Sequence, residues 1–332
     1  MLTSKQLVRG VFESADLPRL PFVPWTFTHA ARLEQIPVRR MFSDPTQYTK
    51  CLLNAQKLYG YEAIISSFDA SLETEICGCP ISWRGDYEAP TVRPNPEFDL
   101  GWLKDISVEG AAKTGRFGTV IESLRRINRV AGQNLALVAV VSGPLTLLAG
   151  LTGRDPLKDL ADRPGETFRD IEVAAALLLK VVQVYCQLEL DVIAIVEKSI
   201  ALCLPDYLSR LRSVFSPIVN TVRFYNAFSI LLPGESSPDN LTNLIDLGFN
   251  GIVAAGIAAD TWHKMRSGHS CILGRAVPVR ILNSDSRELR TYLETSLPEI
   301  SGPGVLLTTD WELPPETPPD NVHLLMNMMS ER

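Results

Sequence analysis

The chain has 332 residues, 45% of them hydrophobic and 21% charged, which is typical of a globular protein with a buried core. Its formal net charge is −6, and no Lys/Arg cluster is dense enough to follow a phosphate backbone, so we expect no nucleic-acid partner. The most apolar window, residues 135–151, contains Gly and Pro and is short for a membrane span, and charges interrupt the N-terminal 22 residues where a signal peptide would be apolar. These features predict a cytoplasmic protein without a membrane partner.

Short apolar, β-branched runs alternate with longer helical stretches along the whole chain. Continuous runs of this kind are typical of parallel strands that are buried on both faces. The expected strands cover residues 22–27, 62–67, 135–142, 191–196, 227–232, 251–255, 270–274 and 304–309. The expected helices cover about 45–59, 118–131, 167–189, 205–224, 238–247, 258–267, 285–297 and 319–330. This alternation predicts an α/β protein with a (β/α)8 TIM barrel, formed as a single domain over residues 1–332.

One segment interrupts the alternation. Residues 74–117 are rich in Pro, Gly and aromatic side chains and follow the second expected strand. A long irregular segment in a compact domain usually has a function. We expect an excursion with local hairpins that partly covers the mouth of the barrel.

Six cysteines are scattered along the chain, and we expect free thiols rather than a disulfide framework. Cys77 and Cys79 form the only close pair, and no second Cys/His pair follows at zinc-finger spacing. A structural or surface thiol is therefore the favoured interpretation for both, rather than a metal ligand.

The active site of a (β/α)8 barrel lies at the C-terminal ends of its strands. That rule selects candidates without reference to any family. Those taken as site residues are His29, Arg32, Asp69, Glu73, Thr146, Glu197, Trp311 and Glu312.

Several stretches resemble the uroporphyrinogen decarboxylase superfamily. They are "DPTQYTKCLLNAQKLYGYEAIISSFDASLETEICGCPI" (44–81), "GRFGTVIESLRRI" (115–127), "VSGPLTLLAGLTG" (141–153) and "PPETPPDNV" (314–322). Within that superfamily they resemble most the methylcobamide:coenzyme M (thiol) methyltransferase branch, over nearly the whole chain. The resemblance implies an α/β barrel, a corrinoid that a partner protein delivers, and a homodimer through barrel faces.

The methyltransferase branch activates its thiol with zinc, which stabilises the thiolate at neutral pH. The resemblance implies a His-x-Cys-Gly set after the fifth strand and a Cys after the eighth. Aligned on Gly234, these ligand positions fall on Leu231, Pro233 and Trp311, and none of these side chains offers zinc a ligand. We therefore expect no metal at that place and no tightly bound cofactor.

The decarboxylase branch holds substrate carboxylates with two arginines and stabilises a cationic intermediate with an aspartate. Here the resemblance assigns the arginine positions to Thr28 and Arg32 and the aspartate to Asp69. A tetra-anionic porphyrinogen would need more cations than this set provides.

Each candidate also has a structural alternative. Asp69 is interpreted as a pocket residue rather than half of a structural salt bridge, and Glu197 likewise as a pocket acid. Of Glu73 and Glu75, only one can face inward, and the resemblance favours Glu73. His29 is equally compatible with acid/base catalysis and with a structural role.

Lys198 could form a Schiff base, and its structural alternative is an ion pair with Glu197 or Asp69. Asp310 and Glu312 are interpreted as hydrated charges at the rim rather than a carboxylate pair. Trp311 is interpreted as an aromatic wall for a flat or apolar ligand, with Thr146 as a further binding residue.

Three functions follow from these observations. The first is a corrinoid-linked methyltransferase that has lost zinc activation, with Asp69, Glu197 and His29 as catalytic groups. The second is a decarboxylase acting on a porphyrinogen or a smaller acid through Arg32 and Asp69. The third is a protein that binds a corrinoid, another tetrapyrrole or a partner without catalysis.

Overall fold

Eight parallel strands form a nearly closed barrel in the computed structural model, which describes residues 2–67, 69–234, 238–266, 268–300 and 304–330. The strand order in the sheet is β1-β10-β9-β8-β7-β6-β5-β2. β1 and β2 are the two edge strands of this sheet, and beside them Glu62 N donates a hydrogen bond to Phe22 O. The strands are β1 (Phe22–Trp25), β2 (Ala63–Ile65), β5 (Ala136–Ser142), β6 (Val192–Val196), β7 (Phe228–Leu232), β8 (Gly251–Ala255), β9 (Ile272–Val277) and β10 (Val305–Glu312).

All eight predicted strands are present, and the α/β barrel prediction is confirmed. The last strand is longer than predicted, because β10 continues to Glu312 and pairs there with Trp25 of β1. Asp310, Trp311 and Glu312 therefore belong to a strand rather than to the turn that follows it.

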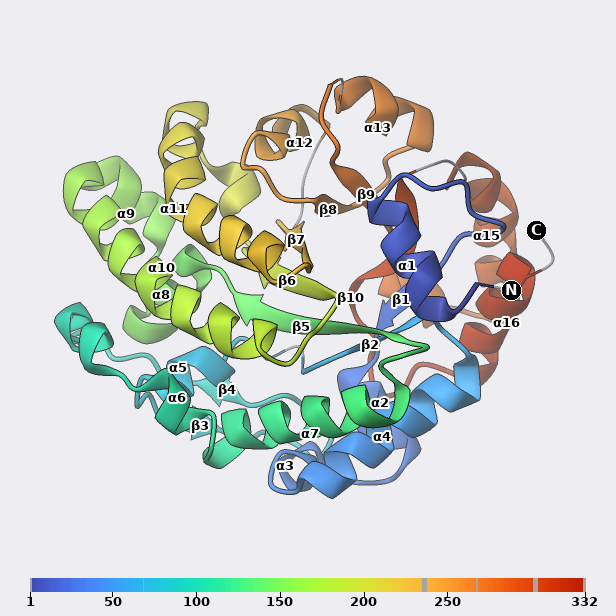
Figure 1. Cartoon of the computed structure of the whole chain (residues 1–332), viewed down its shortest axis with the longest axis horizontal. Helices are drawn as coiled ribbons and strands as arrows, with labels where there is room; N and C mark the ends of the chain where they lie inside the picture. Colours follow the sequence, from blue (N-terminus) through green and yellow to red (C-terminus); the bar gives the residue numbers. More distant parts are fainter. Residues whose placement is uncertain (1, 68, 235–237, 267, 301–303, 331–332) are drawn as a thin grey trace.

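Helices surround the barrel (Figure 1). Their ends carry the expected signals: helix α4 begins after Asp44, whose side chain accepts from Thr46 N, and ends at Gly60 with a φ of 80°. The helices are α1 (Ser4–Phe12), α2 (Phe27–Leu33), α3 (Val38–Met41), α4 (Pro45–Tyr59), α5 (Leu72–Ile76), α6 (Val108–Ala111), α7 (Gly115–Ala131), α8 (Pro144–Thr152), α9 (Pro156–Asp162), α10 (Pro164–Cys186), α11 (Pro205–Phe224), α12 (Pro238–Ile245), α13 (Ala259–Met265), α14 (Val279–Leu282), α15 (Ser286–Ile300) and α16 (Pro319–Ser330).

Two apolar clusters form the core because the side chains of each strand alternate between the lumen and the helices. The larger cluster fills the layer between the sheet and the surrounding helices. The smaller one fills the lumen, where α1 adds Val8, Val11 and Phe12 to residues such as Val138 and Ile230. Helix α1 thus closes the N-terminal end of the barrel, which leaves the C-terminal end for a site.

The excursion after β2 contains the predicted hairpin, formed by the antiparallel strands β3 (Ile81–Ser82) and β4 (Thr91–Val92), and a 3-10 helix η1 (Leu100–Asp105). It packs on the flank of the barrel: Val38 N donates to Asp86 O, and Asn95 N donates to Leu151 O of α8. Within the segment, Trp83 lies near the guanidinium of Arg116, which in turn pairs with Asp69 after β2. Coverage of the barrel mouth by the segment stays a prediction.

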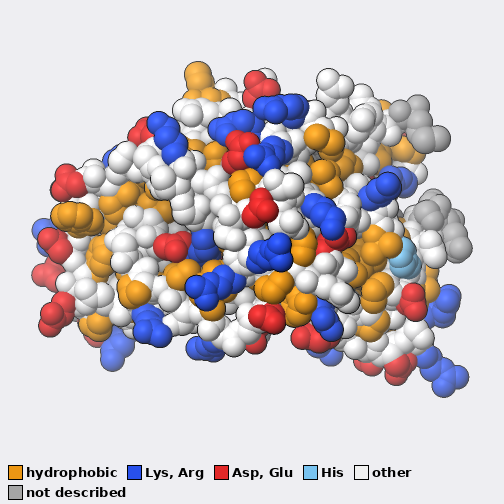
Figure 2. Space-filling model, turned by 90° about the horizontal axis from the view of Figure 1, so that it is seen from below, with side chains coloured by type: hydrophobic (Ala, Val, Ile, Leu, Met, Phe, Trp, Pro, Cys, Tyr) orange, Lys and Arg blue, Asp and Glu red, His pale blue; other side chains and the backbone are white. Residues whose placement is uncertain are grey.

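The described surface has mixed character. Acidic and basic side chains are interspersed among apolar ones on the face seen in Figure 2. No helix in the described ranges is long and apolar enough to cross a membrane. All six cysteines are buried free thiols, as expected.

Candidate active site at the barrel mouth

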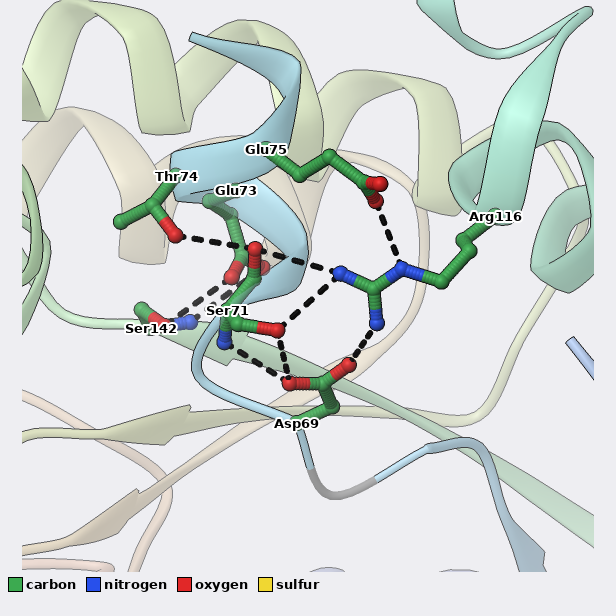
Figure 3. A network of polar contacts seen from close by, with 7 residues as sticks. All are labelled: Asp69, Ser71, Glu73, Thr74, Glu75, Arg116 and Ser142. Atoms are coloured by element: carbon green, nitrogen blue, oxygen red, sulfur yellow. Dashed lines mark hydrogen bonds and ion pairs between the residues drawn. The ribbon is translucent and has the colours of Figure 1, made fainter. Parts of the chain in front are cut away.

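A buried salt-bridge network occupies the end of β2 (Figure 3). Asp69 forms an ion pair with Arg116 at the start of α7, and its other oxygen accepts from Ser71 N at 2.8 Å and Ser71 Oγ at 2.6 Å. The Arg116 guanidinium also reaches Glu75 at 2.6 Å and lies over the Phe42 ring. Asp69 is therefore held in a salt bridge, which was the alternative to the favoured interpretation as a pocket acid.

Glu73 faces inward from α5, as the resemblance implied, whereas Glu75 is partly exposed beside Arg116. Ser142 at the end of β5 donates to Glu73 from its hydroxyl at 3.0 Å, and the two residues appear together in Figure 3. Burial raises the pKa of Glu73 to about 7, although the hydrogen bonds from Ser142 act in the opposite direction. This carboxyl group therefore titrates near neutral pH.

Glu197 links the end of β6 to the start of α8. Its carboxylate accepts from Leu145 N at 2.9 Å, from Thr146 N at 2.8 Å and from Thr146 Oγ1 at 2.6 Å. These are first-turn donors that lack a partner within the helix, so Glu197 caps α8 from another segment. Burial raises the pKa of Glu197 to about 7 against these hydrogen bonds. A Cβ at Gly143 would come within 2.1 Å of Glu197 Oε2, so glycine leaves room for this cap.

The prediction of a hydrated rim charge is wrong for Glu312. Its side chain is buried and accepts a hydrogen bond from Thr28 N at the start of α2. Burial raises the pKa of Glu312 to about 7. The extension of β10 explains the error, because a residue within a barrel strand is covered by its neighbours.

His29 and Arg32 each contact a tyrosine side chain. His29 is 1% exposed, hydrogen-bonds through Nε2 to Tyr59 Oη at 2.7 Å between α2 and α4, and has its pKa lowered by burial. Arg32 is exposed, and its guanidinium stacks on the Tyr87 ring of the excursion. His29 thus makes a contact between α2 and α4, its catalytic role stays untested, and Arg32 and Asp69 are engaged with different partners.

An open cavity of about 640 Å³ lies at the C-terminal ends of β6 to β10. Its lining includes Lys198, Leu232, Pro233, Asp310 and Trp311. The Lys198 amine lies 4.2 Å from the centre of the Trp311 ring, a cation–π contact. The structural alternative for Lys198, an ion pair with Glu197 or Asp69, is not present among the described residues: Glu197 caps α8, and Asp69 binds Arg116.

The resemblance placed the zinc-ligand positions on Leu231, Pro233 and Trp311. Pro233 and Trp311 line the cavity, whereas Leu231 is completely buried in the layer between sheet and helices. None of the three carries a donor atom that zinc uses. Within the part of the chain that the structure describes, no group of three His, Cys, Asp or Glu side chains is arranged for a metal ion.

Arg116 is the site residue that sequence reasoning missed. It lies in the "GRFG" stretch that carried the family resemblance, but it is remote in sequence from every strand end. The available signal was the buried acid at Asp69, since a buried carboxylate needs a nearby cation or donors. The excursion places Arg116 beside Asp69.

Comparison with known proteins agrees with the sequence resemblance. A model of the Uroporphyrinogen decarboxylase (URO-D) family matches residues 3–332. The methylcobamide:CoM methyltransferase MtbA of Methanosarcina mazei is 26% identical over 159 residues, which are 46% of this chain and 45% of that protein. A methylated-thiol–coenzyme M methyltransferase of the same organism is 28% identical over 97 residues, which are 28% of this chain and 25% of that protein. The matched segments thus span less than half of these relatives.

Solved structures of other proteins share this fold. A methyltransferase from Methanosarcina mazei superposes with a TM-score of 0.84 at 19% identity, over 100% of this chain and 99% of that one. A B12-independent methionine synthase from Shewanella gives a TM-score of 0.52 at 12% identity, over 86% of each chain. These likenesses concern the fold, while the family match covers almost every residue. The chain belongs to the uroporphyrinogen decarboxylase family and is related to its methylcobamide:CoM methyltransferases.

Proposed function

We propose that this protein is a corrinoid-linked methyltransferase that works without the zinc site of its relatives. The observation that carries the proposal is the open cavity at the C-terminal ends of β6 to β10, in a chain whose curated relatives are methylcobamide:CoM methyltransferases. In (β/α)8 barrels this end holds the active site. A methylcorrinoid, brought by a partner protein, would supply the methyl group.

The chain's own residues would bind and orient the second substrate. Lys198 and Trp311 would contact it in the cavity, together with Asp310. Asp69, Glu73, Glu197 and Glu312 would act as positioning residues, because each carboxylate is buried and hydrogen-bonded to another segment at the barrel mouth. A homodimer through barrel faces stays a prediction, which sedimentation analysis would check.

Two features favour methyl transfer over decarboxylation of a porphyrinogen. The Arg116 charge is neutralised by Asp69 and Glu75, and Arg32 lies outside the mouth against Tyr87. A polyanionic substrate needs several available cations, since a buried charge without a partner is costly. Lys198 alone would not neutralise four carboxylates.

The direct test is methyl transfer from free methylcobalamin. The purified protein is incubated with methylcobalamin and a panel of thiol, phenol and amine acceptors, and the corrinoid spectrum is followed. We expect loss of the methylcobalamin spectrum with at least one acceptor, and a lower rate in Lys198→Met. Failure with every acceptor, or carbon dioxide release from porphyrinogens, would contradict the proposal.

Whether methyl transfer is independent of zinc requires a separate measurement. We expect the tag-free protein to contain zinc well below one equivalent, and to keep its methyl-transfer rate after treatment with a chelator. One equivalent of zinc, or loss of the rate on chelation that added zinc restores, would show that other residues rebuild the metal site.

A further inference from the structure

The cavity beside Trp311 has an apolar floor and a charged rim. Its floor is formed by Leu232, Val253, Ala254 and Ala276, all buried at the ends of the three neighbouring strands β7, β8 and β9. Small side chains on adjacent strands leave a depression where larger ones would close the barrel mouth. A floor of this kind favours the apolar or flat body of a small molecule.

Lys198 supplies the positive charge in this cavity. Among the described residues no carboxylate forms an ion pair with it, and its amine lies over the Trp311 ring. Its backbone lies against the turn after β7: Gly234 has a φ of 76°, and a Cβ there would come within 2.6 Å of Lys198 O. Partial desolvation in the cavity lowers the pKa of Lys198.

Asp310 lines the same cavity but is engaged elsewhere. Its Oδ1 accepts a hydrogen bond from Val279 N at 2.8 Å, at the start of α14. Burial raises the pKa of Asp310 as well, so its negative charge is disfavoured there. Asp310 therefore does not substitute for the missing partner of Lys198.

The positions where the resemblance places the family's metal ligands carry no side chain that binds a metal. Two of these residues, Pro233 and Trp311, line the cavity, and the Lys198 ammonium group lies there at the strand ends, over the Trp311 ring. We propose that the cavity binds a small organic anion with a flat or apolar body, whose charged group pairs with the Lys198 ammonium while its body fills the apolar floor beside Trp311. A fixed ammonium thus provides the positive charge that a metal ion would bring. Binding of the anion does not depend on the proposed function. Only its role as the methyl-transfer substrate rests on that function.

The test compares a matched pair of probes, 4-fluorobenzoate and its neutral analogue 4-fluorobenzamide, by fluorine NMR titration. We expect the wild-type protein to bind the benzoate about tenfold more tightly than the benzamide. Lys198→Met should remove this preference, while Lys198→Arg should keep most of it because the charge remains. Ala255→Phe, which fills the cavity from the end of β8, should weaken both probes.

Lys158→Met on α9 is the matched control, since it removes an exposed lysine outside the cavity and should change neither affinity. Equal binding of the two probes, no binding of the benzoate to the wild type, or an unchanged preference in Lys198→Met would each overturn the proposal. Competition by inorganic phosphate as strong as by benzoate would overturn the apolar part of it.

This experiment contains no corrinoid and no methyl transfer. Binding of the anion without methyl transfer would leave the inference standing and remove the proposed function. Methyl transfer without a Lys198-dependent preference would do the reverse.

Discussion

The two sides of the barrel mouth treat charge in opposite ways. On the β2 side, Arg116 is 7% exposed and meets Asp69 and Glu75, with Ser71 bridging the pair. On the β6-to-β10 side, Lys198 is exposed to the cavity and contacts the face of Trp311 without an acidic partner among the described residues. On the β2 side the charge of Arg116 is neutralised by acidic side chains of the protein. On the β6-to-β10 side the charge of Lys198 is available to a ligand in the cavity.

This difference separates structural from binding roles. A buried charge whose partner is removed destabilises the fold strongly, because the remaining charge stays desolvated. An exposed charge can lose its side chain with little effect on the fold, and the effect then shows in ligand binding. The predictions below test that separation through the free energy of unfolding, measured by urea denaturation.

Replacing Arg116 should have the largest effect. Arg116→Met leaves Asp69 buried without its cation, so we expect the free energy of unfolding to fall by about 3–5 kcal/mol. Arg125→Met on the same helix removes only an exposed pair with Glu122 and should cost no more than about 1 kcal/mol. The β2 side would not be structural if the two variants were equally stable.

A methyl group at Gly143 should disturb the cap on α8. The φ of Gly143 is −78°, which suits any residue, but the new Cβ would meet Glu197 Oε2 at 2.1 Å. We expect Gly143→Ala to lower the free energy of unfolding by about 1–3 kcal/mol through this overlap. Gly165→Ala is the control, because nothing lies within 4 Å of its Cβ and alanine there should stabilise α10. Equal stability of the two variants would mean that Glu197 moves aside freely.

The pH dependence of stability should report the buried acids. Burial raises the pKa of Glu73 to about 7 in the folded state, from its ordinary value of 4.5. The folded state then holds a proton that the unfolded state releases, so the contribution of Glu73 is full below the unfolded pKa and is lost as pH rises towards 7.

Glu73→Gln should remove this loss. The difference in unfolding free energy between variant and wild type should change with pH by about 1 kcal/mol per unit between pH 5 and 7. Glu88→Gln, at an exposed position in the excursion, should show no such trend. If the difference in unfolding free energy between Glu73→Gln and the wild type did not change with pH, the pKa of Glu73 would not be raised.

The smallest effect on stability is expected on the cavity side. Lys198→Met should change the free energy of unfolding by no more than about 0.5 kcal/mol, because the amine has no ion pair to lose among the described residues. If Lys198→Met lowered the free energy of unfolding as much as Arg116→Met, Lys198 would have a structural role and the two sides of the mouth would not differ.

The sequence by itself determined the barrel and most of the candidate positions. Eight continuous apolar runs separated by helical stretches specify buried parallel strands, because a strand covered on both faces has no polar face to show. The strand ends then located Asp69, Glu197 and Trp311 at the mouth. The assignment of the family's zinc-ligand positions to Leu231, Pro233 and Trp311 stays a prediction from the resemblance.

Only the tertiary structure decided what those side chains do. Arg116 lies at the far end of the long excursion, so nothing local in the sequence couples it to Asp69, and only chain folding brings the two together. Glu197 could face the pocket or cap α8 until the position of α8 was known. Among the described residues Lys198 has no acidic partner, because Glu197 and Asp69 bind elsewhere. Partnership between charged groups depends on distances across the fold, and sequence spacing does not contain those distances.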